Sequence, residues 1–221
     1  MRKDLSEFEL FFLTTKDYQD TMTLLHHLPS RIPLCQAAGQ ITTRSLGEPF
    51  EQDIRECLAS GVSVGARHKV TQMLVGVVLN KTFNLEVLGK ISSMDNLSAL
   101  YRVLEKLYDG VTVFEEIDAH RMLYLIFLCV HEDVGNRGLG GRLLQKTVSL
   151  GAERGYQAVI LEAANSLTAK ICTRLEFETL KTLDLTTLYD YLGLENSITS
   201  GETDFKLMLK RLPNNIKTVK C

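Results

Sequence analysis

The chain has 221 residues, with 25 Lys and Arg against 27 Asp and Glu, and a formal net charge of −2 at pH 7. At about 150 residues per domain this length allows one large domain or two small ones, and folding can remove roughly 70% of the unfolded chain's surface from water. Charged residues at 24% and hydrophobic residues at 45% match an average soluble globular protein. This composition argues against long disordered segments, a nucleic-acid-coating surface and a fibrous repeat.

The first elements in chain order are a strand and two helices. The apolar run at residues 8–14 suits a strand, and residues 16–28 carry a helical pattern that ends near Pro29. A loop-rich region follows. Residues 50–60 then have apolar side chains at helical spacing, and this helix is expected to stop at Gly61.

The middle of the chain predicts a hairpin and a further helix. Two β-branched runs, residues 62–67 and 73–80, are separated by a short polar segment, which favours a hairpin. Gly76 inside the second run indicates a bulge or a close approach of another element. Residues 98–107 are amphipathic with helical spacing.

The second half predicts a strand, a crossover helix and a parallel strand. Residues 122–130 form an unbroken apolar run, which is typical of a strand buried on both faces. A helix at residues 138–153 and a buried strand at 158–161 complete the unit. The remaining predicted elements are a helix at 166–175, strands at 177–183 and 205–209, and a loop at 196–203 between them. Because no repeat or linker interrupts the pattern, we expect residues 1–221 to form a single mixed α/β (α+β) domain.

The cysteines and the apolar runs set the expected compartment. The five cysteines are scattered, with no C-x-x-C pair and no His at zinc-finger spacing, so no metal site is expected. The N-terminus has no apolar stretch of signal-peptide length, and the longest apolar run is too short to span a bilayer. We therefore predict a cytoplasmic protein with reduced thiols and with no membrane or nucleic-acid partner.

A glycine-rich turn between the predicted strand at 122–130 and the next helix is the most informative motif. It holds Gly135, Gly138, Gly140 and Gly141. Glycines let backbone N–H groups converge, and a helix start carries a partial positive charge, so the turn suits a phosphate or pyrophosphate. The alternative is a plain turn in which the glycines serve only the backbone conformation.

Three anion-binding loops need to be distinguished. A nucleotide triphosphate loop would need Lys and then Ser or Thr after its last glycine, where this chain has Gly141 and Arg142. A dinucleotide fingerprint would need a small residue where Leu143 stands, and it normally follows the first strand of the sheet. The position, flanks and spacing instead favour the pyrophosphate loop of an acetyl-coenzyme A dependent N-acetyltransferase.

On this motif the sequence resembles the GCN5-related N-acetyltransferase (GNAT) superfamily. The superfamily pattern is Arg or Gln, two residues, Gly, one residue, then Gly or Ala, and Gly135, Gly138 and Gly140 occupy those positions. Gly135 departs from the pattern. The loss of its side chain leaves in place the backbone N–H groups that hold most of the pyrophosphate in this superfamily.

Over nearly its whole length the chain resembles the invertebrate arylalkylamine N-acetyltransferases. Residues 58–67 with 74–80 look like their second and third strands, and residues 125–131 look like their fourth. The segments 162–165 (Glu-Ala-Ala-Asn) and 175–177 (Leu-Glu-Phe) resemble the family's Glu-Ala-Thr and Leu-Gly-Phe signatures. Ala164 and Glu176 depart from those signatures.

The resemblance implies a mixed central sheet flanked by helices, with its fourth and fifth strands splayed apart around the acyl-pantetheine arm of acetyl-CoA. It implies that backbone groups of Leu128, Cys129 and Val130 bind the arm. Arg137 and Arg142 are the available cations for a phosphate, or are solvated side chains on the helix surface. The other cofactor-binding residues implied by the resemblance are Gly135, Asn136, Gly138, Leu139, Gly140, Gly141 and Asn165.

Acetyl transfer requires a neutral amine, and an alkyl amine with a pKa near ~10 is neutral at pH 7 only at a cost of about 4 kcal/mol. The family places a glutamate before a Pro-Leu pair for this purpose, and Ile32 occupies that position here. Alternative bases are His26, His27, His131 and Glu48, although a surface or capping role is the commoner one for such residues.

Of the two hydroxyls that the family uses on the helix after the fifth strand, Ala164 has none and Thr168 keeps one. Cys172 falls at the position of the tyrosine with which many superfamily members protonate the thiolate. Thr168 and Cys172 are therefore the catalytic candidates. The alternatives are a Thr168 hydroxyl bonded into its own helix and a Cys172 side chain that only packs.

The sequence thus favours an enzyme that moves an acetyl group from acetyl-CoA, with no metal, to a small primary amine such as an arylalkylamine or a polyamine. Its alternatives are a catalytically impaired coenzyme A binding protein and, more remotely, a nicotinamide oxidoreductase. Composition gives no argument for an aromatic pocket. The aromatic residues that could contribute to one are Phe11, Phe12, Tyr18, Phe50 and Phe114.

Overall fold

A seven-stranded sheet organises the computed structural model, which describes residues 5–26, 28, 43–84, 98–192 and 204–213. The strand order is β1-β2-β3-β4-β5-β7-β6. Neighbours pair antiparallel except β4 and β5, which are parallel. The strands are β1 (Phe8–Phe12), β2 (Val64–His68), β3 (Leu74–Thr82), β4 (Met122–Val130), β5 (Ala158–Ala163), β6 (Glu178–Asp184) and β7 (Asp204–Arg211).

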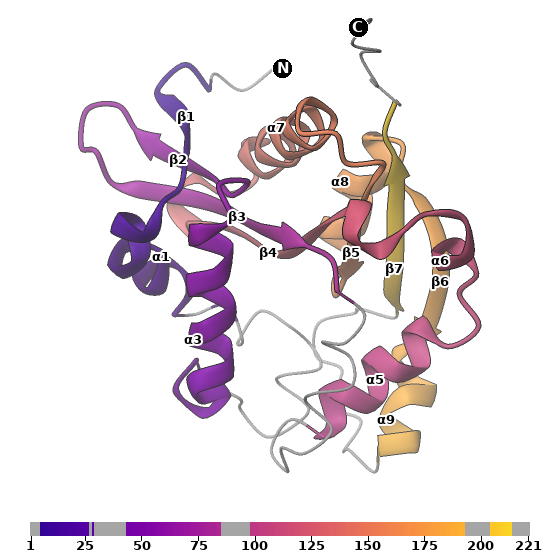
Figure 1. Cartoon of the computed structure of the whole chain (residues 1–221). Coiled ribbons are helices and arrows are strands. Elements are labelled where there is room, and N and C mark those ends of the chain that lie inside the picture. Colours follow the sequence, from indigo (N-terminus) through magenta and orange to yellow (C-terminus); the bar gives the residue numbers. More distant parts are fainter. Residues whose placement is uncertain (1–4, 27, 29–42, 85–97, 193–203, 214–221) are drawn as a thin grey trace, which may run out of the picture.

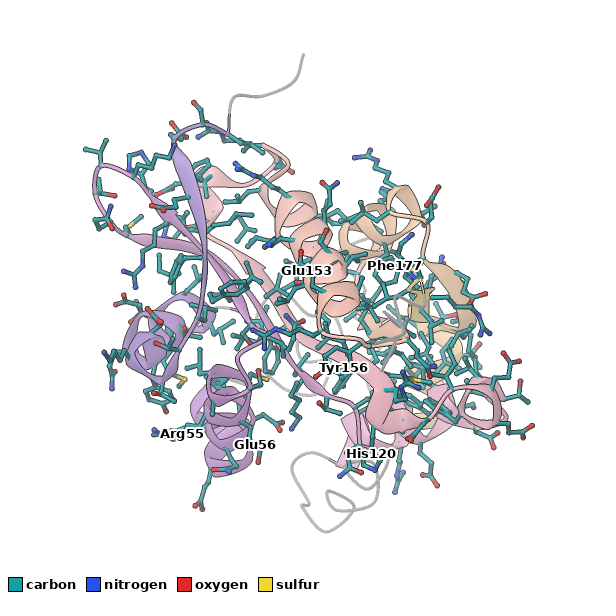
Figure 2. All side chains as sticks on the ribbon, turned by 45° about the horizontal axis from the view of Figure 1, so that its top comes forward. Arg55, Glu56, His120, Glu153, Tyr156 and Phe177 are labelled. Carbon is teal, nitrogen blue, oxygen red and sulfur yellow. The ribbon has the colours of Figure 1, made fainter. Side chains whose placement is uncertain are left out.

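Helices cover both faces of the sheet (Figure 1). One face packs against α7 (Leu139–Glu153) and α8 (Ser166–Arg174), and the other packs against α1 (Tyr18–Leu25), α3 (Thr43–Ala59), α5 (Ser98–Tyr108) and α9 (Leu185–Leu192). The shorter helical turns are α6 (Val113–Glu116), η1 (Thr15–Asp17), η4 (Ala119–Arg121) and η5 (Glu132–Val134). Side chains fill the layers between the helices and the sheet, whereas Arg55 and Glu56 on α3 are exposed (Figure 2).

Most of the predicted elements are confirmed. Residues 122–130 form β4 with the predicted bounds, and the hairpin in the middle of the chain is the antiparallel pair β2 and β3. The predicted helix at 50–60 is part of α3, which begins at Thr43 and is kinked at Gly47, where φ is 62°. Helix α9 was not predicted, because its β-branched and aromatic residues are weak helix formers. Residues 196–203, the predicted loop, lie outside the described part of the chain.

The bulge predicted at Gly76 is confirmed together with a close approach. The register between β2 and β3 shifts next to Gly76. A Cβ atom on Gly76 would lie 2.9 Å from the Cδ1 atom of Leu143 on α7. The missing side chain therefore lets α7, the helix that follows the glycine turn, pack directly on β3.

A second bulge lies in β4 and changes which face its side chains occupy. Leu79 pairs with Phe127 but Asn80 pairs with Leu125, so Ile126 is an extra residue. Before the bulge Leu123 and Leu125 pack on the α7 side, and after it Leu128 and Val130 do. A one-residue shift reverses the alternation of a strand, which explains why even-numbered residues replace odd-numbered ones on that face.

β4 and β5 separate at the same point. Their parallel register runs from Met122 and Ala158 to Leu125 and Leu161 and ends there, although both strands continue. The expectation that residues 122–130 are buried on both faces is wrong for the second half of β4, because Ile126, Phe127, Leu128 and Val130 are only partly buried. Within the described residues, β4 beyond Leu125 therefore has no strand paired to it on its β5 side.

Candidate active site

The glycine turn leaves β4 through η5 and enters α7 at Gly138. Gly138 is the N-cap of α7, has a φ of 95° and offers no side-chain cap to the helix. The first four N–H groups of a helix have no intrahelical acceptor, and the first turn here consists of Leu139, Gly140 and Gly141. With so few side chains in the way, these amides and the helix dipole form a suitable cradle for an anion such as a pyrophosphate.

The edge of β4 lies beside this turn. Leu128 and Val130 are half-buried and contact the core under α7, while Cys129 points to the opposite face, where its Sγ lies 3.7 Å from the carbonyl oxygen of Leu24. Because the β5 register stops at Leu161, an extended ligand arm can lie along this part of β4 without displacing a strand.

Helix α8 begins at the C-terminal end of β5, on the other side of the separation. Asn165 is its N-cap, and the Asn165 Oδ1 atom accepts a hydrogen bond from the Thr168 backbone N–H at 2.8 Å. The Thr168 side chain is half-buried, and within the described residues its hydroxyl makes no hydrogen bond, unlike the Thr173 hydroxyl, which donates to the carbonyl of Ala169. The Thr168 hydroxyl is therefore available to a ligand.

Cys172 lies one turn deeper in the same helix. Its side chain is 0% exposed and belongs to the core under α7 and α8. Loss of hydration raises the pKa of the Cys172 thiol to about 12. This thiol therefore holds its proton at neutral pH and is a weak acid.

A carboxylate and two phenols meet where β4 and β5 begin to separate. The Tyr124 hydroxyl on β4 lies 3.1 Å and 3.0 Å from the two carboxylate oxygens of Glu162 on β5. The Tyr108 hydroxyl on α5 also donates to Glu162. Loss of hydration raises the pKa of Glu162 above its usual range, although both phenols lower it in part by donating to the charged form. Burial, and next the Glu162 charge, raise the pKa values of both tyrosines well above 10.

Comparison with known proteins identifies the fold. Residues 87–172 match the model of the acetyltransferase (GNAT) family. None of the curated proteins matches the sequence significantly.

Solved structures resemble this protein over most of its length. Arylalkylamine N-acetyltransferase 2 from Aedes aegypti superimposes with a TM-score of 0.77 at 21% identity, covering 93% of this chain and 99% of that chain. A Drosophila melanogaster polyamine N-acetyltransferase that catalyses the formation of N-acetylagmatine gives 0.74 at 17% identity, covering 93% and 100%. A putative acetyltransferase from Salmonella typhimurium with its cofactor acetyl-CoA gives 0.56 at 12%, covering 97% and 99%. At these identities the similarity shows the fold.

Both arginines of the glycine turn contact the N-terminal segment. Arg137 forms an ion pair with Glu7, and its guanidinium carbon lies 5.0 Å from the ring centre of Phe8. The Arg142 Nη1 atom donates to the carbonyl of Leu5 at 3.0 Å. Neither arginine is simply solvated, and a contact of either one with a phosphate stays a prediction.

The other candidate bases within the described residues are dispersed. His131 caps η5, its Nδ1 atom accepting from the Asp133 backbone N–H at 3.4 Å, and both His26 and Glu48 are exposed. His27 and Ile32 lie outside the described residues. None of the described bases lies in the Glu162 cluster.

The aromatic candidates are also dispersed. Phe11 and Tyr18 lie under Arg67 and Arg55, Phe50 packs on Phe127, and Phe12 is exposed. Only Phe114 among these candidates lies near Glu162, through its ring contacts with Phe83 and Tyr108.

Sequence reasoning did not select Glu162, Tyr108 or Tyr124 as site residues. Glu162 belonged to a quoted signature, and a carboxylate at the end of a buried apolar strand was the available signal. The tyrosines gave no signal, because they come from segments far apart in the sequence. No group of His, Cys, Asp and Glu side chains that could hold a metal ion is found within the described residues. The helices in that part of the chain are too short or too polar to cross a membrane.

Proposed function

We propose that this protein is an acetyl-CoA-dependent N-acetyltransferase that acetylates a small primary amine of the arylalkylamine or polyamine class. One observation carries the proposal: the parallel strands β4 and β5 separate after Leu125 and Leu161, and the glycine turn that follows β4 opens a helix. The first feature suits an extended acyl arm, and the second suits the diphosphate to which such an arm is attached.

The cofactor-binding residues expected from the sequence fit this role. Leu139, Gly140 and Gly141 present first-turn amides to a pyrophosphate, while Gly135, Asn136 and the two arginines flank it. Leu128, Cys129 and Val130 offer an extended backbone to the arm, and Asn165 borders it from α8. When bound, acetyl-CoA would supply a thioester as the acetyl donor.

Thr168 and Cys172 are the candidate proton donors on α8. Donation from Cys172, with its pKa of about 12, to a thiolate of ordinary pKa near ~8.5 is uphill by roughly 5 kcal/mol. The Thr168 hydroxyl lies nearer the start of α8 and is half-buried. The hydroxyl is itself a weaker acid than a thiol, so we propose that Thr168 passes its proton to the thiolate while it takes one from water, and that Cys172, which is buried away from water, packs the helix.

A coenzyme A binding protein without catalysis is the second candidate. Ala164 carries no hydroxyl, and Ile32 stands where the resembled family has a carboxylate, so two expected chemical groups are missing. This candidate shares the cofactor site and differs only in acetyl transfer.

A cytoplasmic location and a single domain over residues 1–221 stay predictions from the sequence.

The experiment compares coenzyme A binding by Gly138→Asp and Gly155→Asp in isothermal titration calorimetry. Gly138 and Gly155 both have positive φ values, 95° and 81°, and a Cβ atom on either meets nothing within 4 Å, so the backbone strain is matched. Only the new carboxylate at residue 138 would face the pyrophosphate. We expect Gly138→Asp to abolish binding and Gly155→Asp to retain it.

Acetyl transfer is then followed with acetyl-CoA, a thiol reagent and a panel of tyramine, tryptamine, dopamine and spermidine. Thiol release with any of these amines supports the enzyme. Binding without thiol release supports the second candidate, and equal binding by both Asp variants would contradict the placement of the cofactor.

A further inference from the structure

The Glu162 cluster has a geometry that follows from the strand register. Tyr124 stands opposite Ile160, and Glu162 lies two residues further along β5, so both side chains project from the same face as diagonal neighbours. Glu162 is also the first residue of β5 beyond its register with β4. It therefore lies at the point where the two strands begin to diverge.

The Glu162 carboxylate has hydrogen-bond donors but no cation among the described residues. Its side-chain partners there are the two neutral phenols of Tyr108 and Tyr124. Lys206 on β7 stands opposite Ala163 and so projects from the other face, where its Nζ atom lies 3.1 Å from Asp204. Removing a charged carboxylate from water without a counter-charge costs free energy, and a bound cation would offset that cost.

Aromatic rings and partial exposure complete the cluster. The Phe83 ring stacks on Tyr108 and Phe114, with ring centres 5.9 Å and 5.4 Å apart, and meets Tyr124 edge-on at 5.3 Å. Tyr124, Phe114 and Glu162 keep partial solvent access although the protein surrounds the cluster on most sides. The faces of aromatic rings attract cations and also pack against other apolar groups. An arylalkylammonium therefore matches the site, because its aryl group fits the rings and its ammonium group fits the Glu162 carboxylate.

We propose that Glu162 binds the ammonium group of the amine substrate and accepts its proton, with Tyr108 and Tyr124 holding the carboxylate in place. This inference rests on the proposed function. In the proton step, one N–H bond of the ammonium breaks and its electron pair stays on nitrogen, while the proton forms an O–H bond with Glu162. A neutral amine and a carboxylic acid result, and the nitrogen lone pair becomes free to attack a carbonyl. Glu162 would thus perform from β5 the task for which Ile32 lacks a carboxylate.

The first test measures binding of tyramine and of 4-ethylphenol, which keeps the aryl group but lacks the ammonium. Calorimetry uses the whole chain, with and without saturating coenzyme A. We expect the parent to bind tyramine at least tenfold more tightly than 4-ethylphenol, and Glu162→Gln to lose this preference. Glu153→Gln, an exposed carboxylate on α7 (Figure 2), is the matched control and should keep it. A preference unchanged in Glu162→Gln would overturn the proposal.

A second measurement needs no variant. Because the pKa of Glu162 lies above its usual range, the tyramine preference should grow as the pH rises through that pKa and disappear on acidification. The titratable groups facing Glu162 in the described structure are Tyr108 on α5 and Tyr124 on β4, whose pKa values lie well above 10. Neither changes charge in this range, and tyramine itself stays protonated below about 10. A preference that is constant between pH 4 and 9 would contradict the role of Glu162.

The outcomes separate this inference from the proposed function. If Gly138→Asp and the parent bind coenzyme A equally, the cofactor placement fails, whatever tyramine does. If coenzyme A binding depends on Gly138 but the tyramine preference is insensitive to Glu162, only the ammonium site fails. Glu162→Gln should leave coenzyme A binding within about twofold of the parent, because none of the cofactor residues named above contacts it in the structure.

Discussion

Two side chains one helical turn apart on α8 differ in what chemistry they can perform. Thr168 and Cys172 lie at positions i and i+4, on the same side of the helix, and the sequence proposed both as catalytic. In the folded protein Thr168 is half-buried and Cys172 is completely buried. Because burial removes hydration from a thiolate, Cys172 keeps its proton, whereas a hydroxyl needs no such charge to bond to a ligand.

We expect Thr168→Val to lower kcat by roughly a hundredfold, the lower end of the effect of losing a general acid. Cys172→Ala should change kcat less than about threefold but lower the free energy of unfolding by about 1–3 kcal/mol, because it leaves a small cavity in the core. Steady-state kinetics and chemical denaturation measure the two effects. Thr173→Val is the control for Thr168, since the Thr173 hydroxyl only bonds back to Ala169. A loss of kcat in Cys172→Ala at unchanged stability would reverse this assignment.

At the scale of elements, the site depends on how β4 fits between its neighbours. The extra residue at Ile126 reverses the facing of the strand just where β5 departs, so Leu128 and Val130 face α7 instead of the opposite layer. Gly76 on β3 fixes the other contact, because its missing side chain brings α7 close to the sheet. The position of the glycine turn is thus set by a bulge and by a helix contact.

Gly76→Ala should lower the free energy of unfolding by about 1–3 kcal/mol, because its Cβ atom would lie 2.9 Å from the Cδ1 atom of the fully buried Leu143. Gly141→Ala is the matched control on α7. Its Cβ atom would lie 3.8 Å from Ile171, an ordinary contact, and alanine favours the helix by up to about 1 kcal/mol. Urea denaturation compares the two variants. If Gly76→Ala were as stable as Gly141→Ala, the close packing of α7 on β3 would not be what requires a glycine.

At the scale of the whole molecule, the N-terminal segment and the glycine turn form one surface. Residues 5–8 contact Arg137 and Arg142 across more than half the chain length, through an ion pair, a ring contact and a hydrogen bond to a carbonyl. Both cations expected to approach the diphosphate therefore have protein acceptors. If these two side chains bind the cofactor as proposed, they would exchange their N-terminal contacts for it.

Glu7→Gln should tighten coenzyme A binding by up to about fivefold, since the Glu7 carboxylate competes with a phosphate for Arg137 and a partly exposed ion pair contributes less than about 1 kcal/mol. The gain should shrink at high salt, which screens both interactions. Calorimetry at two salt concentrations measures it, with the exposed Glu9→Gln as the control. Weaker binding by Glu7→Gln would mean that this ion pair shapes the turn for the cofactor.

The amino-acid sequence by itself determined most elements of this protein and the nature of its turn. The apolar run of β4, the helical spacing of α7 and the glycines between them are local patterns, and local patterns specify strands, helices and turns. The sequence did not reveal that β7 lies between β5 and β6, because the order of strands depends on contacts between distant segments.

The tertiary structure alone decided how the β4 bulge turns its side chains, what the two arginines contact and how deeply Cys172 is buried. It also brought Glu162 together with Tyr108 and Tyr124, which lie 54 and 38 residues away in the chain. Burial and electrostatic environment depend on everything that surrounds a side chain, so they are set only when the distant segments pack together.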